Sequence, residues 1–276
     1  MTSFDSDSLN AMVAHTSEQI KKAPQNSDLR VHLFQYLALL GQWDRAASQL
    51  DLCYKLNASS MPLTTQYNLA ILAEQKREQV FSGNVKPKTP CVDDQAESMM
   101  TQMLSALAFD LEKDFVKAAS IREQVLEQMD ENPCRITYAT KNSNSLTEMV
   151  SEHEWLMDMD SRIANLCEFM KDGEYYWITY SQIDKITLLP PKGLIDLIWI
   201  NVAITLKGNE QEIVGILPAR YPLIAEKNSE QRDELLKCKR TIWLERGDNY
   251  WGEGQKILST EQDEFGILDI RQIEFL

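Results

Sequence analysis

Residues 29–56 read LRVHLFQYLALLGQWDRAASQLDLCYKL, and this stretch decides the first half of the fold. Its first part repeats large apolar residues every three or four positions, and Asp28 stands where a helix cap is expected. Gly41 ends that helix, and a second apolar stripe of the same period begins near Asp44. The two segments are therefore predicted to form an antiparallel helical hairpin that turns at Gly41.

The remaining chain divides into a helical part and a strand-rich part. Methionine, which suits helices, occurs only up to Met170, whereas eight of the ten glycines lie at or after Gly173. Further helices are expected over 64–81, 94–111, 115–129 and 148–170, with loops over 82–92 and 132–145. Strands are expected over 175–180, 183–189, 197–206, 212–217, 241–245, 255–259 and 267–275, and 225–239 is a charged insertion. The predicted fold class is α+β, with a helical domain over 1–150 and a compact β-rich domain over 151–276 that begins with a helix.

The helical hairpin has the layout of a tetratricopeptide repeat. The small residue at the turn, Gly41, is followed by the aromatic Trp43 and then by Ala46, which lets two helices approach closely. Residues 114–118 repeat the aromatic and the alanine 72 positions later, and a weaker copy begins at Ser8. These copies predict an N-terminal tetratricopeptide-like domain.

In a tetratricopeptide array, the first helix of each hairpin lines a concave groove. The residues at the matching offsets are Val31, Gln35, Ala38, Leu39, Met100, Met103, Leu107, Asp110 and Leu111. Most of these side chains are apolar, and an apolar groove that contains methionine suits an amphipathic partner helix with a basic edge. The competing interpretation is that neighbouring helices or the second domain cover these residues as ordinary core.

Composition and charge argue against several classes of function. The chain has 28 Lys and Arg against 42 Asp and Glu, and the net charge of −14 repels nucleic-acid phosphates and anionic lipid surfaces. No run of 18 apolar residues is present and no secretory signal follows Met1, so a cytoplasmic protein is expected, without nucleic-acid or membrane partners. The five cysteines lack the spacing of metal ligands and are expected to be reduced and structural: Cys53, Cys91, Cys134, Cys167 and Cys238. No cofactor and no metal ion are expected.

An acidic cluster beside His153 is the candidate for chemistry. Glu154, Asp158 and Asp160 provide carboxylates of the kind that perform acid–base catalysis or hold a hard metal ion. On the expected helix, Glu154 and Asp158 share a face, and Arg162 stands in salt-bridge register with Asp158. Three interpretations remain open: a helix stabilised by ion pairs, an acidic spot that binds a partner, and a catalytic pair.

The expected strands carry four tryptophans: Trp177, Trp199, Trp243 and Trp251. The simpler interpretation is packing in the core or between the domains, and the alternative is an exposed aromatic face that binds a partner. The β-rich domain is therefore a second possible location for partner binding.

Several longer motifs occur in order along the chain. They are Leu29-Arg30-Val31 with Phe34-Gln35 and Leu40-Gly41-Gln42-Trp43-Asp44-Arg45-Ala46; Glu154-Trp155 with Asp158-x-Asp160-Ser161-Arg162; Gly173-x-Tyr175-Tyr176-Trp177; Pro190-Pro191 with Asp196-Leu197-Ile198-Trp199; Pro218-Ala219-Arg220-Tyr221-Pro222; and Leu268-Asp269-Ile270-Arg271. Together they resemble the ImpE/TagJ family, also called SciE-type proteins, which are accessory proteins of bacterial type VI secretion systems. The resemblance covers nearly the whole chain and is weakest over 134–149.

The resemblance implies a non-enzymatic adaptor that binds the N-terminal helix of the small subunit of the contractile sheath. Sheath assembly, or sheath recycling through an indirect link to the associated unfoldase, is the process implied, and the family offers no catalytic residue to transfer. The alternative function is a carboxylate- or metal-dependent hydrolase centred on Glu154, Asp158 and Asp160.

Overall fold

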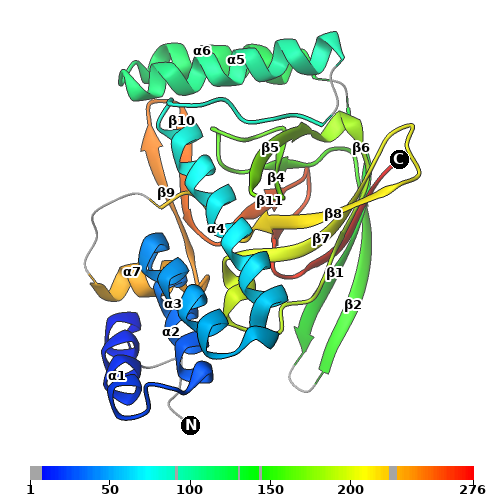
Figure 1. Ribbon diagram of the computed structural model, residues 1–276. Coiled ribbons are helices and arrows are strands. Elements are labelled where there is room, and N and C mark those ends of the chain that lie inside the picture. Colours follow the sequence, from blue (N-terminus) through cyan, green and yellow to red (C-terminus); the bar gives the residue numbers. More distant parts are fainter. Residues whose placement is uncertain (1–7, 91–92, 130, 143–144, 224–228) are drawn as a thin grey trace.

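A computed structural model describes residues 8–90, 93–129, 131–142, 145–223 and 229–276 (Figure 1). The helices of this part are α1 (Leu9–Lys22), α2 (Ser27–Leu39), α3 (Trp43–Leu56), α4 (Met61–Phe81), α5 (Asp94–Leu111), α6 (Phe115–Glu127) and α7 (Ser229–Leu236), with short 3-10 turns at Ala58–Ser60, Tyr180–Gln182 and Leu194–Leu197. The helices predicted before residue 130 are therefore confirmed. The charged insertion contains α7, and its residues 225–228 lie outside the described part of the chain.

The hairpin of α2 and α3 forms for the reasons that its sequence suggests. Asn26, rather than Asp28, caps α2, because its side-chain oxygen accepts hydrogen bonds from the first backbone amides of the helix. Gly41 adopts the left-handed backbone conformation, with φ at +70°, which a turn directly after a helix requires. Trp43 then starts α3, is buried, and donates its indole N–H to Glu78 of α4 at 2.6 Å. The hairpin is thus attached to α4 as well as closed on itself.

One antiparallel sheet of eight strands forms most of the β part. Its strands lie in the order β2-β1-β13-β6-β7-β8-β4-β5. Their bounds are β1 (Cys134–Asn142), β2 (Ser145–His153), β4 (Leu166–Lys171), β5 (Glu174–Thr179), β6 (Ile183–Leu188), β7 (Trp199–Leu206), β8 (Glu212–Pro218) and β13 (Ile270–Phe275). The β part also contains a hairpin, formed by β9 (Thr241–Arg246) and β10 (Asn249–Gly254). A small sheet is formed by β3 (Met157–Asp158), β11 (Ile257–Ser259) and β12 (Glu264–Gly266). All seven predicted strands are present.

The helix predicted over 148–170 and the loop predicted over 132–145 are wrong. These residues form β1, β2, β3 and β4, so the β part starts with a hairpin instead of a helix. β4 is buried on both faces, and its apolar run therefore lacks the alternation that distinguishes a strand from a helix. The predicted division between residues 150 and 151 remains a prediction, and both of these residues lie in β2.

Two hydrophobic layers lie on opposite faces of the sheet. Successive side chains of β4 point alternately into these two layers. Leu166 and Met170 belong to a core shared with the helices, whereas Cys167 and Phe169 belong to a core within the β part. Trp177 and Trp199 lie in the first of these cores, beneath the helices. Figure 1 shows α4 running along the sheet, between α5 and α6 at one end and α1 to α3 at the other. The helices and the sheet therefore share one continuous core.

The described cysteines are buried or half-buried. Cys53, Cys134, Cys167 and Cys238 are free in the structure, Cys91 lies outside the described residues, and the reduced state remains an expectation. Burial raises the pKa of the thiols of Cys134, Cys167 and Cys238 to about 12, so they stay protonated and unreactive near neutral pH.

Candidate functional site

The predicted acidic cluster does not form one site. Glu154 is exposed, whereas Asp158 and Asp160 are buried at the end of β3 and in the turn that follows. Arg162 pairs with Asp160 and not with Asp158, because the segment is a turn and not the predicted helix. In the described part of the chain, no group of three or more His, Cys, Asp or Glu side chains is arranged to hold a metal ion.

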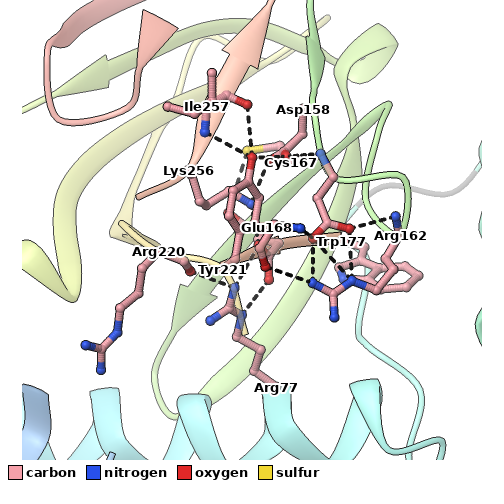
Figure 2. A network of polar contacts seen from close by, with 12 residues as sticks. Arg77, Asp158, Arg162, Cys167, Glu168, Trp177, Arg220, Tyr221, Lys256 and Ile257 are labelled. Atoms are coloured by element: carbon pink, nitrogen blue, oxygen red, sulfur yellow. Dashed lines mark hydrogen bonds and ion pairs between the residues drawn. The ribbon is translucent and has the colours of Figure 1, made fainter. Parts of the chain in front are cut away.

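Asp158 and Asp160 belong instead to a buried charge network, which has an ion pair between α4 and β4 at its centre (Figure 2). Arg77 of α4 donates Nε–H to Glu168 Oε1 at 2.6 Å and Nη2–H to Oε2 at 3.1 Å. The same guanidinium donates to Glu74 Oε1 at 2.9 Å and to the backbone carbonyl of Arg220 at 3.0 Å. This two-pronged geometry is the strong form of an arginine–carboxylate pair, and it fastens the helix to the sheet.

Lys256 extends the network from Glu168 to Asp158. Its Nζ lies 2.5 Å from Glu168 Oε2 and 2.7 Å from Asp158 Oδ2. The other oxygen of Asp158 accepts the Tyr221 hydroxyl at 2.9 Å, and that hydroxyl accepts the backbone N–H of Ile257 at 3.0 Å. Arg77, Tyr221 and Lys256, from three separate segments of the chain, thus donate to these two carboxylates.

A second pair fixes the turn after β3. Arg162 donates Nε–H to Asp160 Oδ1 at 2.9 Å, and the backbone N–H of Gly252 in β10 donates to Asp160 Oδ2 at the same distance. The guanidinium of Arg162 also lies 4.9 Å from the ring centroid of Trp251. Trp177 and Trp199 are buried and Trp243 and Trp251 are half-buried, so the packing interpretation is confirmed for the first two.

Each buried carboxylate of the network is paired with a buried cation. The carboxylates are Glu74, Asp158, Asp160 and Glu168, and the cations are Arg77, Arg162 and Lys256. Burial by itself raises the pKa of Glu168, but Arg77 and Lys256 outweigh burial and lower that pKa to about 2. For Asp158, burial raises the pKa by more than Lys256 lowers it, so the pKa lies above the ordinary value. Paired and enclosed in this way, the carboxylates hold separate elements of the chain together.

Arg220 has a different structural role, which the sequence analysis did not assign. It donates Nη1–H to the carbonyl of Leu39 at 2.8 Å and to that of Leu236 at 3.1 Å, and Nη2–H to the carbonyl of Ala38 at 3.2 Å. A cation at the C-terminal end of α2 satisfies free carbonyls and complements the helix dipole. Its burial lowers the pKa of Arg220 to about 10. The motif Pro218-Ala219-Arg220-Tyr221-Pro222 was the signal that marked this position.

The residues predicted to line a tetratricopeptide groove differ in their accessibility. Ala38, Leu39, Met103 and Leu107 lie in the core that the helices share with the sheet. Asp110 is also buried and pairs with Arg122, whereas Val31, Gln35 and Met100 are half-buried and Leu111 is exposed. In this conformation the four core residues contact other parts of the chain, as the competing interpretation supposes, and a partner-binding role for the set remains a prediction.

An open groove lies elsewhere, between α4 and the sheet. It has a volume of about 240 Å³. It is lined by Gln66, Tyr67, Leu69, Ala70 and Ala73 of α4, by the turn from Met170 to Gly173, by Trp199 and Asn201 of β7 and by Val214, Gly215 and Ile216 of β8. The groove is mostly apolar and opens toward the part of the sheet that no helix covers.

Leu39 and Leu111, two of the leucines in the predicted tetratricopeptide groove, provide a first test of the fold. We expect Leu39→Ala, which empties a fully buried position, to lower the free energy of unfolding by about 2–5 kcal/mol. Leu111→Ala is the matched control, with 49% of the residue exposed, and we expect a change within about 0.5 kcal/mol. Urea denaturation followed by circular dichroism measures both values. Equal losses in the two variants would contradict the burial described here.

A second test removes the central cation of the network. We expect Arg77→Met to lower the free energy of unfolding by about 3–5 kcal/mol, because Glu168 and Glu74 remain buried without it. Lys76→Met is the control on the neighbouring residue, whose ion pair with Glu174 is partly exposed, and we expect a loss of about 1 kcal/mol or less. Similar losses, measured by the same denaturation, would show that the buried pair does not hold α4 on the sheet.

A third test concerns pH. Because the pKa of Glu168 is about 2 in the folded protein and ordinarily 4.5, its stabilisation is complete above pH 4.5 and is lost as the pH falls toward 2. Asp158 acts in the opposite direction, since its pKa is raised. Glu168→Gln should therefore weaken the acid-induced loss of stability between about pH 5 and pH 2. Denaturation at a series of pH values, with the exposed Glu148→Gln as control, measures the slope, and an unchanged slope would refute this role.

Comparison with known proteins agrees with this architecture. The family described as ImpE protein matches residues 151–274. The type VI secretion system accessory component TagJ of Pseudomonas aeruginosa is 33% identical over 258 residues, which cover 94% of this chain and 84% of that protein. The crystal structure of protein VPA1032 from Vibrio parahaemolyticus has the same fold, with a TM-score of 0.82 and 20% identity over 97% of this chain and 94% of that one. Identity at this level along nearly the entire length shows that the chain belongs to the ImpE/TagJ family.

Proposed function

We propose that this protein is a non-enzymatic, cytoplasmic adaptor of a type VI secretion system. Its partner would be the N-terminal helix of the small contractile-sheath subunit, and its binding would modulate sheath assembly or recycling. The observation that carries the proposal is the 33% identity, over 94% of the chain, to a protein named as an accessory component of such a system.

The site geometry supports binding better than catalysis. A general acid or base must reach the reacting group of a substrate, but Asp158 and Asp160 are buried and already bound by Tyr221, Lys256 and Arg162. Glu154 is exposed and lies apart from them. The alternative hydrolase centred on these three carboxylates therefore has no common site in which to work.

The charge of the protein supports the kind of partner proposed. A net charge of −14 favours the approach of a helix with a basic edge and disfavours acidic partners. No helix in the described part of the chain is both long and apolar enough to cross a membrane.

We expect a synthetic peptide of the N-terminal helix of the small sheath subunit to bind with micromolar or tighter affinity, because a short amphipathic helix in an apolar groove typically contributes that much. Fluorescence anisotropy of the labelled peptide, titrated with the full-length protein, measures the dissociation constant.

Two control peptides sharpen this experiment. A scrambled peptide of the same composition retains the charge but not the apolar face, and a peptide with one central residue replaced by proline retains the rest of the sequence but not the helix. Binding of the scrambled peptide with equal affinity would reduce the interaction to non-specific electrostatic attraction. No saturable binding of the native peptide would overturn the proposed partner.

A further inference from the structure

The open groove between α4 and β8 has the size of a side-chain pocket. Its volume of about 240 Å³ exceeds the cavity of about 150 Å³ that holds a benzene ring. It is smaller than the roughly 300–1,000 Å³ of most small-molecule and cofactor sites. A groove of this size suits one large apolar side chain, inserted as the anchor of a longer segment.

Small residues keep the groove open. Ala70 and Ala73 on α4 leave room above the sheet, and Gly173 closes one end without a side chain. Asp172 and Gly173 both have positive φ, at +52° and +77°, as the tight turn between β4 and β5 requires. A Cβ atom at Gly173 would lie 3.3 Å from Leu69, so the turn packs directly against the helix.

The walls of the groove are held rigidly. Trp199 at its back donates its indole N–H to Glu74 Oε2 at 3.1 Å and stacks on Tyr67, with ring centroids 6.3 Å apart. Glu74 in turn accepts from Arg77, so the groove shares the buried charge network. A preformed groove loses little conformational entropy when a ligand binds.

The mouth of the groove carries polar groups suited to a peptide. The side-chain amides of Gln66 and Asn201 make no hydrogen bond to any residue that the structure describes. An amide both donates and accepts, so it can pair with the backbone or with polar side chains of a bound segment.

The uncovered sheet face beside the groove adds a short apolar surface to its floor. Val214 is 66% exposed, and the strand register places it beside Ala203, beyond which the row becomes polar at Thr187 and Gln272. The neighbouring row across the sheet is charged and carries Glu152, Arg135, Glu274, Lys185 and Glu212. This row has one carboxylate more than it has cations, which favours a basic edge on the ligand and disfavours a second copy of the same acidic face.

We propose that this groove is the docking site for an amphipathic helix with a basic edge, with one large apolar side chain inserted between Ala73 and Val214. The proposal rests on the proposed function for the identity of the helix, which is the N-terminal helix of the small sheath subunit. It differs from the predicted tetratricopeptide groove, because the ligand contacts the sheet as well as α4.

Two valines of one cross-sheet row provide a matched test. Val214 in β8 and Val150 in β2 lie at opposite ends of the row, and both are more than half exposed. We expect Val214→Arg to weaken binding of the sheath peptide at least tenfold, because it removes an apolar contact and repels the basic edge. Val150→Arg carries the same change in charge and should bind within twofold of the unchanged protein. Gln66→Arg, at the mouth of the groove, should also weaken binding.

Thermal unfolding of each variant checks that the fold is retained. Should Val214→Arg fail to fold, a photo-crosslinking amino acid at position 214 should capture the peptide, and the same amino acid at position 150 should not. Equal affinities of the Val214→Arg and Val150→Arg variants, or equal capture at the two positions, would overturn the groove while leaving the proposed function intact.

Two other outcomes concern the occupant. No peptide binding by the unchanged protein would overturn the proposed function and, with it, the helix assigned to the groove. A dimer of the unchanged protein that Val214→Arg dissociates, observed by sedimentation, would show that a second copy occupies the groove instead.

Discussion

The ion pair between Arg77 and Glu168 is the contact on which the rest of the structure depends. It joins the C-terminal part of α4 to β4, the strand next to the β5 edge of the sheet, across 91 residues of sequence, with both side chains buried. A buried charge is costly unless it is paired and fully hydrogen-bonded, so every neighbouring group must be placed to match. The positions of Lys256, Asp158 and Tyr221 follow from this requirement.

The network gives a structural role to several of the motifs that mark this chain. Asp158, Asp160 and Arg162 fix the turn after β3 to β10, and Ser161 holds the same strand through its hydroxyl, which accepts from Tyr250 N–H at 2.9 Å. Arg220, whose backbone carbonyl accepts from Arg77, donates its own side chain to the C-terminal end of α2. These residue types resemble those of an active site, but here their charges and hydrogen bonds are used to join the helices to the β part.

The attachment of the helices to the β part limits where a partner can bind. The first helices of the two hairpins, α2 and α5, bury much of their apolar surface in the core that the helices share with the sheet, which leaves little of it for a partner. The open apolar surface lies instead where α4 leaves the sheet, beside the uncovered faces of β7 and β8. A rigid frame with an unfilled apolar groove suits the adaptor role proposed above, because binding then requires little rearrangement.

Local patterns in the sequence determined the elements that bury a single face. The helices from α2 to α6 and the hairpin of β7 and β8 followed from apolar periodicity and turn residues, because these signals act over a few positions. β1 to β4 could not be predicted in this way. The carboxylates of 148–160 have helical spacing, and β4 is buried on both faces by parts of the chain far away in sequence.

The charge network and the groove were likewise predictable from the sequence only in part. Sequence alone identified Asp158, Asp160, Arg162 and Arg220 as members of distinctive motifs, but not their partners, since an ion pair across 91 residues leaves no local pattern. The predicted concave residues were placed on the correct helices, yet only tertiary packing decided that Leu39 and Met103 are core. The groove beside Val214 was likewise decided by tertiary structure, because it exists only where a helix and a sheet diverge. Sequence determines which faces are apolar, and packing determines which of those faces remain open.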